Sequence, residues 1–297
     1  MNRPDGTAKL ERDAFARYAP FFEKAAPYLD DYAPEPVALV VPYARLFSGR
    51  PGGIDHTKRL VRLLSERFGV VPQAFPDLRL TAEQLAGVKL AIVPAPEVLD
   101  KTTAAALLAA SKAGTKVLVT GHVEGDSYGR ETPSLRALGL LGGSRAVALH
   151  EWSGWGGAPA GKGAKAGQDV TFESLAQHWL KRSTKPSPTA LTGNVWHEPL
   201  PLDLARETAP LEAILGAALQ AAGVATQPAA DGVLVRVLHA PRAALVAVVN
   251  ETAEKASRRV VVGGRPLSVP VDALRARLVL VDAKGQVVAA TPGDPVR

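Results

Sequence analysis

The sequence predicts an α/β domain built on a parallel sheet, followed by a small antiparallel β-sandwich. Three observations lead to this fold class. Short, unbroken apolar runs alternate with helical segments in the first two thirds of the chain, and parallel strands buried on both faces have this pattern. Beyond residue 223, short β-type runs follow one another without helices between them, as in a sandwich. We expect an N-terminal helix over 1–34, the α/β domain over 35–230 and the sandwich over 231–297.

The first element is predicted to be one amphipathic helix behind a polar leader. Aromatic and alanine side chains recur on one face between Phe15 and Tyr28, and Pro34 and Pro36 end the helix. A stripe of this kind must be buried, either on its own domain or against a partner.

In the α/β domain, predicted strands alternate with predicted helices, which implies a parallel sheet with right-handed crossovers. Its predicted strands are Val37–Val41, 70–75, 88–94, Lys116–Thr120 and 145–149. Its predicted helices are Asp55–Phe68, a short one opened by Thr81 as N-cap, and Lys101–Lys112 closed by Gly114. Residues 153–168 form a predicted glycine-rich loop, and helices are expected over 171–182 and 203–222, joined by coil around Trp196-His197-Glu198. The sandwich strands are expected at 233–239, 243–250, 258–262, 267–269, 277–281 and 286–290.

Composition excludes several classes of function. The net charge of +6 is spread along the chain, so no nucleic-acid surface is expected. The chain has no cysteine, which rules out disulfides, thiolate metal sites and thiol catalysis. No apolar run approaches the ~20 residues that cross a bilayer, and the polar N-terminus lacks the apolar region of a signal peptide. We expect a cytoplasmic protein without a membrane partner.

The loop 121–126 is the first place to look for chemistry, because ligands of parallel sheets bind beyond the carboxyl ends of the strands. It holds His122, Glu124 and Asp126. Further polar and aromatic residues follow the neighbouring predicted strands and complete a candidate ligand crevice: Arg45, Glu97, His150, Glu151 and Trp152. The crevice would bind a sugar or another small ligand, or serve acid–base chemistry. The simpler alternative is an ordinary polar loop where a strand ends.

A metal or nucleophile at this edge has less support. Two histidines with carboxylates can bind a divalent metal, but the spacing fits no known metal signature, so neither metal nor cofactor is expected. The position after Thr120 is where amidotransferase-like folds carry a cysteine on a tight turn. Glycine stands there, and Ser127 is too distant to replace the cysteine, so a glutaminase triad is excluded.

Several segments together resemble the rear half of family-42 β-galactosidases. They are VALVVPY, TAEQLAGVKLAIVPAPEVLD and AGTKVLVTGHVEGD, followed by ALVAVVNETAEKASRRVVV. The resemblance implies a flavodoxin-like, class I amidotransferase-like "trimerisation" domain and a β-sandwich. The phrase RPDGTAK and the helix after it look like the last turn and closing helix of the family's catalytic TIM barrel. The rest of that barrel, with its two catalytic glutamates, is missing, so no catalytic residue is expected.

Three hypotheses remain open. The first is a non-catalytic oligomerisation or accessory module that walls the active site of a barrel. Its partners would be a homo-oligomer, for example a trimer, or a separate TIM-barrel subunit docked on the exposed face of the first helix. The second is a stand-alone hydrolase or carbohydrate-binding protein that uses the crevice around His122, Glu124 and Glu151. The third is a scaffold without any connection to sugars.

Overall fold

The computed structural model describes residues 4, 7, 10–29, 33–47, 55–143, 193–205, 208–227, 232–293 and 295–296. The chain divides into two compact units. One, the α/β unit, comprises Glu35–Leu64 and Val71–Ala225. The other, the sandwich unit, comprises Met1–Pro34, Ser65–Val70 and Thr226–Arg297. The predicted fold class, a parallel α/β sheet followed by an antiparallel sandwich, is confirmed.

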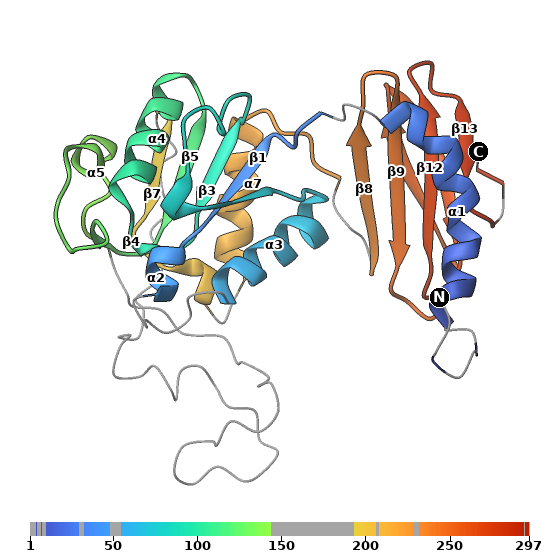
Figure 1. Cartoon of the computed structure of the whole chain (residues 1–297), viewed down its shortest axis with the longest axis horizontal. Coiled ribbons are helices and arrows are strands. Elements are labelled where there is room, and N and C mark those ends of the chain that lie inside the picture. Colours follow the sequence, from blue (N-terminus) through green and yellow to red (C-terminus); the bar gives the residue numbers. More distant parts are fainter. Residues whose placement is uncertain are drawn as a thin grey trace, which may run out of the picture. The chain divides into compact units, whose positions relative to one another are not determined.

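The α/β unit is built on a five-stranded sheet in the order β2-β1-β3-β5-β7 (Figure 1), and its neighbouring strands are parallel. The strands are β1 (Val37–Val41), β2 (Gln73–Pro76), β3 (Leu90–Val93), β5 (Lys116–Thr120) and β7 (Val195–Glu198). The central strands are almost completely buried, which explains their continuous apolar sequences.

The fifth strand differs from the prediction. The strand beside β5 is β7, whose Trp196-His197-Glu198 was expected to be coil. Its burial alternates, with Trp196 and Glu198 buried and His197 half-buried, so the segment has the period of a strand despite its polar composition. The predicted strand 145–149 lies outside the described residues.

Helices cover both faces of the sheet (Figure 1). On one face, α4 (Lys101–Lys112) and α5 (Pro133–Leu138) form a core with alternate residues of β1, β3 and β5. On the other face lie α3 (Asp55–Phe68) and α7 (Ala209–Ala221). The helix α7 begins six residues later than predicted, because a 3-10 turn, η2 (Leu202–Leu204), comes first. The predicted helix 171–182 falls outside the part of the chain that the structure describes.

Short elements follow the strands at their carboxyl ends. They are α2 (Tyr43–Phe47), η1 (Asp77–Arg79) and the parallel pair β4 (Glu97–Val98) with β6 (Val123–Gly125). The helix predicted at Thr81 is a set of turns instead, in which Thr81 and Gln84 exchange hydrogen bonds between side chain and backbone N–H, at 2.9 and 3.3 Å. That exchange is the pattern of a capping box, which made the segment look like the start of a helix.

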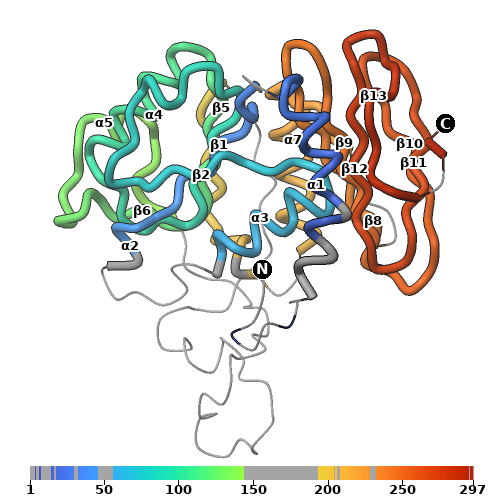
Figure 2. Tube along the Cα trace, turned by 45° about the vertical axis from the view of Figure 1, so that its right-hand side comes forward, coloured from blue at the N-terminus to red at the C-terminus, as the bar shows by residue number. Residues whose placement is uncertain are grey.

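The sandwich unit has a four-stranded antiparallel sheet in the order β13-β12-β9-β8 and a hairpin, β10-β11, which packs on it as a second layer (Figure 2). The strands are β8 (Val233–His239), β9 (Ala243–Asn250), β10 (Ala256–Val262), β11 (Arg265–Val271), β12 (Ala276–Asp282) and β13 (Val287–Ala290). Valines from both layers fill the core, as expected for strands with one inward face.

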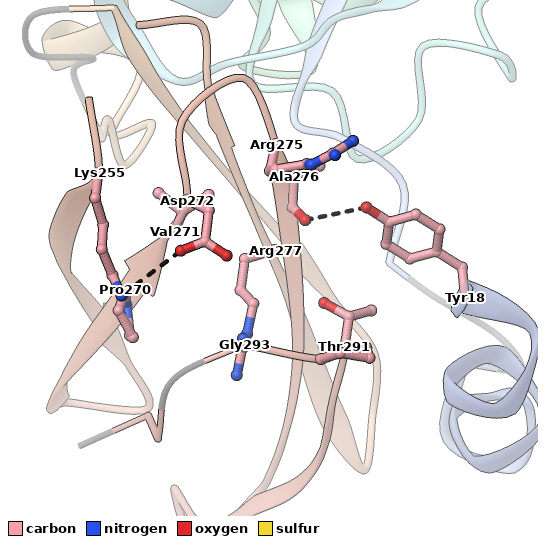
Figure 3. Close-up of a pocket in the computed structure, with 11 residues that line it drawn as sticks. Tyr18, Lys255, Pro270, Val271, Asp272, Arg275, Ala276, Arg277, Thr291 and Gly293 are labelled. Atoms are coloured by element: carbon pink, nitrogen blue, oxygen red, sulfur yellow. Dashed lines mark hydrogen bonds and ion pairs between the residues drawn. The ribbon is translucent and has the colours of Figure 1, made fainter. Parts of the chain in front are cut away.

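The first helix, α1 (Leu10–Leu29), packs on the outer face of that four-stranded sheet. Its Phe21 and Ala25 form a cluster with β9 and β12 residues, including Leu245 and Leu280. The Tyr18 hydroxyl donates to the Ala276 carbonyl oxygen at 3.2 Å (Figure 3). The aromatic stripe predicted from the sequence is therefore covered, in part, by the chain's own sandwich.

No helix among the described residues is long and apolar enough to cross a membrane.

Candidate functional site

The carboxyl edge of the parallel sheet gathers most of the residues that the sequence marked as candidates. Arg45 lies in α2 after β1, and Glu97 begins β4 after β3. His122, Glu124 and Asp126 follow β5. The edge is where parallel sheets place ligands. The remaining candidates, His150, Glu151 and Trp152, lie outside the described residues.

Two residues at this edge that the sequence did not mark, Thr120 and Asp203, form its centre. The Thr120 hydroxyl lies 2.9 Å from each carboxylate oxygen of Asp203 and accepts the Ala95 N–H at 2.8 Å. Asp203 and Thr120 are both fully buried. One hydroxyl therefore connects the end of β5, the turn after β3 and the η2 segment after β7.

Arg45 connects the same turn to α2. Only 2% of its side chain is exposed. It donates to the Ala95 carbonyl oxygen, and its Nη2 lies 3.1 Å from Glu97 Oε1. Burying a charged side chain is costly unless it is paired and hydrogen-bonded, and Arg45 has a partner of each kind.

The backbone between β3 and β4 needs this support. Ala95 and Glu97 have φ values of +35° and +55°, in the left-handed region that costs a non-glycine residue of the order of 1–3 kcal/mol. Both Ala95 backbone groups are bonded, one to Thr120 and one to Arg45. The buried polar side chains therefore fix a strained turn, and we call this group (Arg45, Glu97, Thr120, Asp203) the edge network.

Burial in this network shifts the titration of Asp203. Desolvation raises its pKa to about 7, although the hydrogen bond from Thr120 and the charge of Arg45 favour the ionised form. Asp77, which accepts the Ala44 N–H at the end of the neighbouring strand, has its pKa raised to about 6, again by desolvation. Arg59 of α3 has a lowered pKa because burial outweighs the attraction of Asp203.

These shifts predict the pH dependence of stability. Because the folded state holds a proton on Asp203 and Asp77 more tightly than the unfolded state, both carboxyls stabilise the fold at low pH. This contribution is lost as the pH rises through about 6 to 7. The free energy of unfolding of the α/β unit should be higher at pH 5 than at pH 8, by roughly 2–4 kcal/mol.

Urea unfolding followed by circular dichroism would measure this difference. The variant Asp203→Asn should lose most of it, since an amide does not titrate. A stability that is constant from pH 5 to pH 8 in the original chain would contradict the assignment.

His122 and Glu124 form a second, more open pair at the edge. The His122 Nε2 lies 3.8 Å from Glu124 Oε1, and the two side chains are 25% and 31% exposed. Between them, Val123 pairs with Glu97 across the β4-β6 ladder, so this pair is next to the edge network. At this distance the two side chains form no direct hydrogen bond with each other, but both can contact the same polar ligand.

Asp126, by contrast, has a structural role. Its carboxylate accepts the backbone N–H groups of Tyr128 and Arg130, each at 2.9 Å, and pairs with the Arg130 guanidinium at 2.8 Å. The hydrogen bond from Arg130 lowers the pKa of Asp126 to about 2. The side chain is thereby fully occupied within its own loop.

Two cavities lie away from this edge. A hollow of about 590 Å³ at the amino ends of β3 and β5 is lined by the turn 82–89, by residues at the end of α4 and just after it (109–116), and by Ala221 and Ala222 at the end of α7. A second one, of about 40 Å³, lies in the sandwich unit between Tyr18, Arg277 and Thr291 (Figure 3). That volume holds only a few water molecules. Neither lining includes a residue of the carboxyl edge.

No three His, Asp or Glu side chains converge on a potential metal position within the described ranges. The edge network fixes the backbone at Ala95 and pairs the buried Arg45 side chain with Glu97. Among the described candidates at this edge, His122 and Glu124 are the pair exposed enough to contact a ligand.

Known proteins resemble this chain in fold. No family model and no curated protein matches the sequence. Among solved structures, the β-galactosidase from Rahnella sp. R3 superposes with a TM-score of 0.61 and 13% identity, over 95% of this chain and 46% of that one. A GH42 β-galactosidase from G. stearothermophilus superposes with a TM-score of 0.58 and 13% identity, over 95% of this chain and 45% of that one. For the β-galactosidase from Bacillus circulans sp. alkalophilus, the TM-score is 0.57 and the identity 14%, over 92% of this chain and 45% of that one. The chain thus has the fold of part of the GH42 β-galactosidases and spans less than half of their length.

Proposed function

We propose that the chain is a non-catalytic accessory module of a β-galactosidase-like glycoside hydrolase, which serves assembly and contributes to the walls of an active site. One observation carries the proposal. The fold likeness takes in 92–95% of this chain but only 45–46% of the β-galactosidases. A protein with the fold of a part is best explained as performing the role of that part.

The state of the carboxyl edge supports the non-catalytic role. Where a parallel sheet offers its ligand crevice, the described side chains of Arg45, Thr120 and Asp203 are buried. Thr120 is bonded to Asp203, and Arg45 is paired with Glu97. They are engaged in fixing a strained turn. The catalysis would belong to a barrel in another part of the enzyme or in a separate subunit, and the module would assemble as a homo-oligomer, for which a trimer is the form that the resemblance implies.

The test is an assay of the isolated chain with a chromogenic nitrophenyl β-D-galactopyranoside. We expect no turnover above the rate without protein, and the same result for Glu124→Gln and Glu151→Gln. Turnover by the original chain that either substitution abolishes would overturn the proposal.

A second candidate function, a stand-alone hydrolase or carbohydrate-binding protein, is favoured by the exposure of His122 and Glu124. It requires that galactose or lactose shift the NMR signals of the loop that carries them. It also requires that Glu124→Gln remove those shifts. A purely structural module would show no shifts on addition of either sugar.

A further inference from the structure

The hollow at the amino edge of the parallel sheet has the size of a small-molecule site. Its volume is about 590 Å³, and such sites measure roughly 300–1,000 Å³. The ends of α4 and α7, which cover opposite faces of the sheet (Figure 1), line it together with the turn 82–89. Three separate stretches of the α/β unit thus form the hollow, and we call it the amino-edge hollow.

The lining of the amino-edge hollow is mainly apolar. Half of the lining residues are alanines, and Leu85 and Val88 add larger apolar groups. Several of the alanines, including Ala86, Ala109 and Ala221, are exposed to solvent. Small side chains give a surface with little relief, against which a flat or extended apolar group can lie. Covering this surface removes it from water, which favours binding.

Two lysines, Lys89 and Lys116, line the same hollow. The Lys89 ammonium group donates to the Gly223 carbonyl oxygen at 3.1 Å. The Lys116 ammonium group donates to Asn194 Oδ1 at 2.6 Å and to the Gly193 carbonyl oxygen at 3.2 Å. Because an ammonium group has three N–H donors, Lys89 retains two of them for a ligand and Lys116 retains one.

The positive charge of these lysines is not offset within the hollow. No described lining residue is acidic, and neither lysine forms an ion pair with a described carboxylate. The C-terminal ends of α4 and α7 oppose the lysines, but each helix end is equivalent to only about half a negative charge. Two ammonium groups therefore leave the hollow with a net charge of about +1, which favours an anion.

We propose that the amino-edge hollow binds a small carboxylate that carries an apolar group. The apolar group lies against the alanines, and the carboxylate accepts charge-assisted hydrogen bonds from the remaining lysine donors. A neutral apolar molecule makes only the first contact and a simple anion only the second, so binding requires both parts. The inference goes beyond the proposed function, because the hollow shares no residue with the carboxyl edge.

An NMR titration of the full chain with 2-naphthoate tests the proposal. The amide signals of Gly87 and Gly114, which line the hollow, should shift and saturate with a dissociation constant of the order of 1 mM, typical of a ligand with few atoms. Two probes separate the contributions. We expect 2-naphthamide, which has the same rings without the charge, to bind several-fold more weakly. Acetate, which has the charge without the rings, should cause no saturating shift at the same concentrations.

Substitution of the lysines tests the anion contact. Lys89→Met and Lys116→Met should each weaken the binding of 2-naphthoate about two- to fivefold, the effect of one partly exposed charge, and should leave that of 2-naphthamide unchanged. Lys101→Met is the matched control, because Lys101 is exposed at the other end of α4 and does not line the hollow. It should bind both probes like the original chain. Since Lys116→Met also loses the hydrogen bond to Asn194, Lys89→Met decides if that variant fails to fold.

A bulky side chain in the hollow tests the apolar contact. Ala109→Trp should fill part of the volume and weaken 2-naphthoate binding at least fivefold. Ala105→Trp, at an exposed position one turn earlier in α4 that does not line the hollow, should bind like the original chain. An absence of shifts at about 10 mM 2-naphthoate, roughly ten times the expected dissociation constant, would overturn the proposal. Equal affinity for the carboxylate and the amide would also overturn it, and so would binding that Lys89→Met and Ala109→Trp leave unchanged.

Discussion

Replacing Asp203 by alanine should lower the free energy of unfolding of the α/β unit by roughly 2–4 kcal/mol, the combined cost of an unsatisfied buried hydroxyl and a cavity. The carboxylate is fully buried and lies 2.9 Å from the Thr120 hydroxyl. Its loss leaves the Thr120 hydroxyl without the group to which it donates, and removes side-chain volume from a fully buried position. Urea unfolding at pH 7.5, followed by circular dichroism, would measure the loss.

The matched control is Asp203→Asn. The amide keeps the shape and can still accept from Thr120, so its cost should be nearer 1–2 kcal/mol, roughly that of one altered buried hydrogen bond. A loss of less than about 1 kcal/mol in Asp203→Ala would show that the edge network does not support the sheet.

Replacing Asn250 by alanine should destabilise the sandwich unit by roughly 2–4 kcal/mol, because several buried polar groups lose their partner together. The Asn250 amide donates to the carbonyl oxygens of Glu254 and Asp272, at 2.6 and 3.2 Å. Its side-chain oxygen accepts the Thr252 N–H at 2.9 Å. This one side chain, 1% exposed, fixes the turn after β9 and the end of β11.

Thr252→Val is the control for this prediction. It removes one hydroxyl of the same turn, which lies 2.7 Å from the Asn250 oxygen, and should cost about 1 kcal/mol. Thermal unfolding of both variants would compare them. If the two substitutions cost the same, Asn250 would not be the organiser of the turn.

The sequence was sufficient where burial alone decides structure. Strands such as Val37–Val41 and Lys116–Thr120 are apolar throughout because helices cover both of their faces. The strands of the sandwich were recognisable by their regular spacing and by the turn residues between them. In these segments, local propensity and tertiary environment favour the same conformation.

The strand β7 could not be predicted in the same way. Trp196-His197-Glu198 offers no apolar run, and Pro199 follows it. It becomes a strand because β5 provides a free edge, and because tertiary contacts hold its side chains. Lys116 lies over the Trp196 ring, and His197 Nε2 lies 2.7 Å from the Gly121 carbonyl oxygen. Long-range pairing of this kind leaves no period in the sequence.

The site was predicted in part. The rule that chemistry follows parallel strands led to Arg45, Glu97 and His122, and the structure brings them to one edge. The rule does not reveal Asp203, which is 83 residues from Thr120 in sequence and was expected to lie at the start of a helix. The one available signal was a threonine at the end of a buried strand, since a buried hydroxyl needs a partner.

Hydrogen exchange of the Ala95 amide tests the central claim most directly, that the described carboxyl edge is a closed structural network. This N–H donates to the buried Thr120 hydroxyl at 2.8 Å. We predict that it exchanges only when the α/β unit unfolds, at the rate of the amides in β3 and β5, and that lactose leaves the rate unchanged. Exchange as fast as that of an exposed loop amide, or protection that lactose increases, would contradict the account.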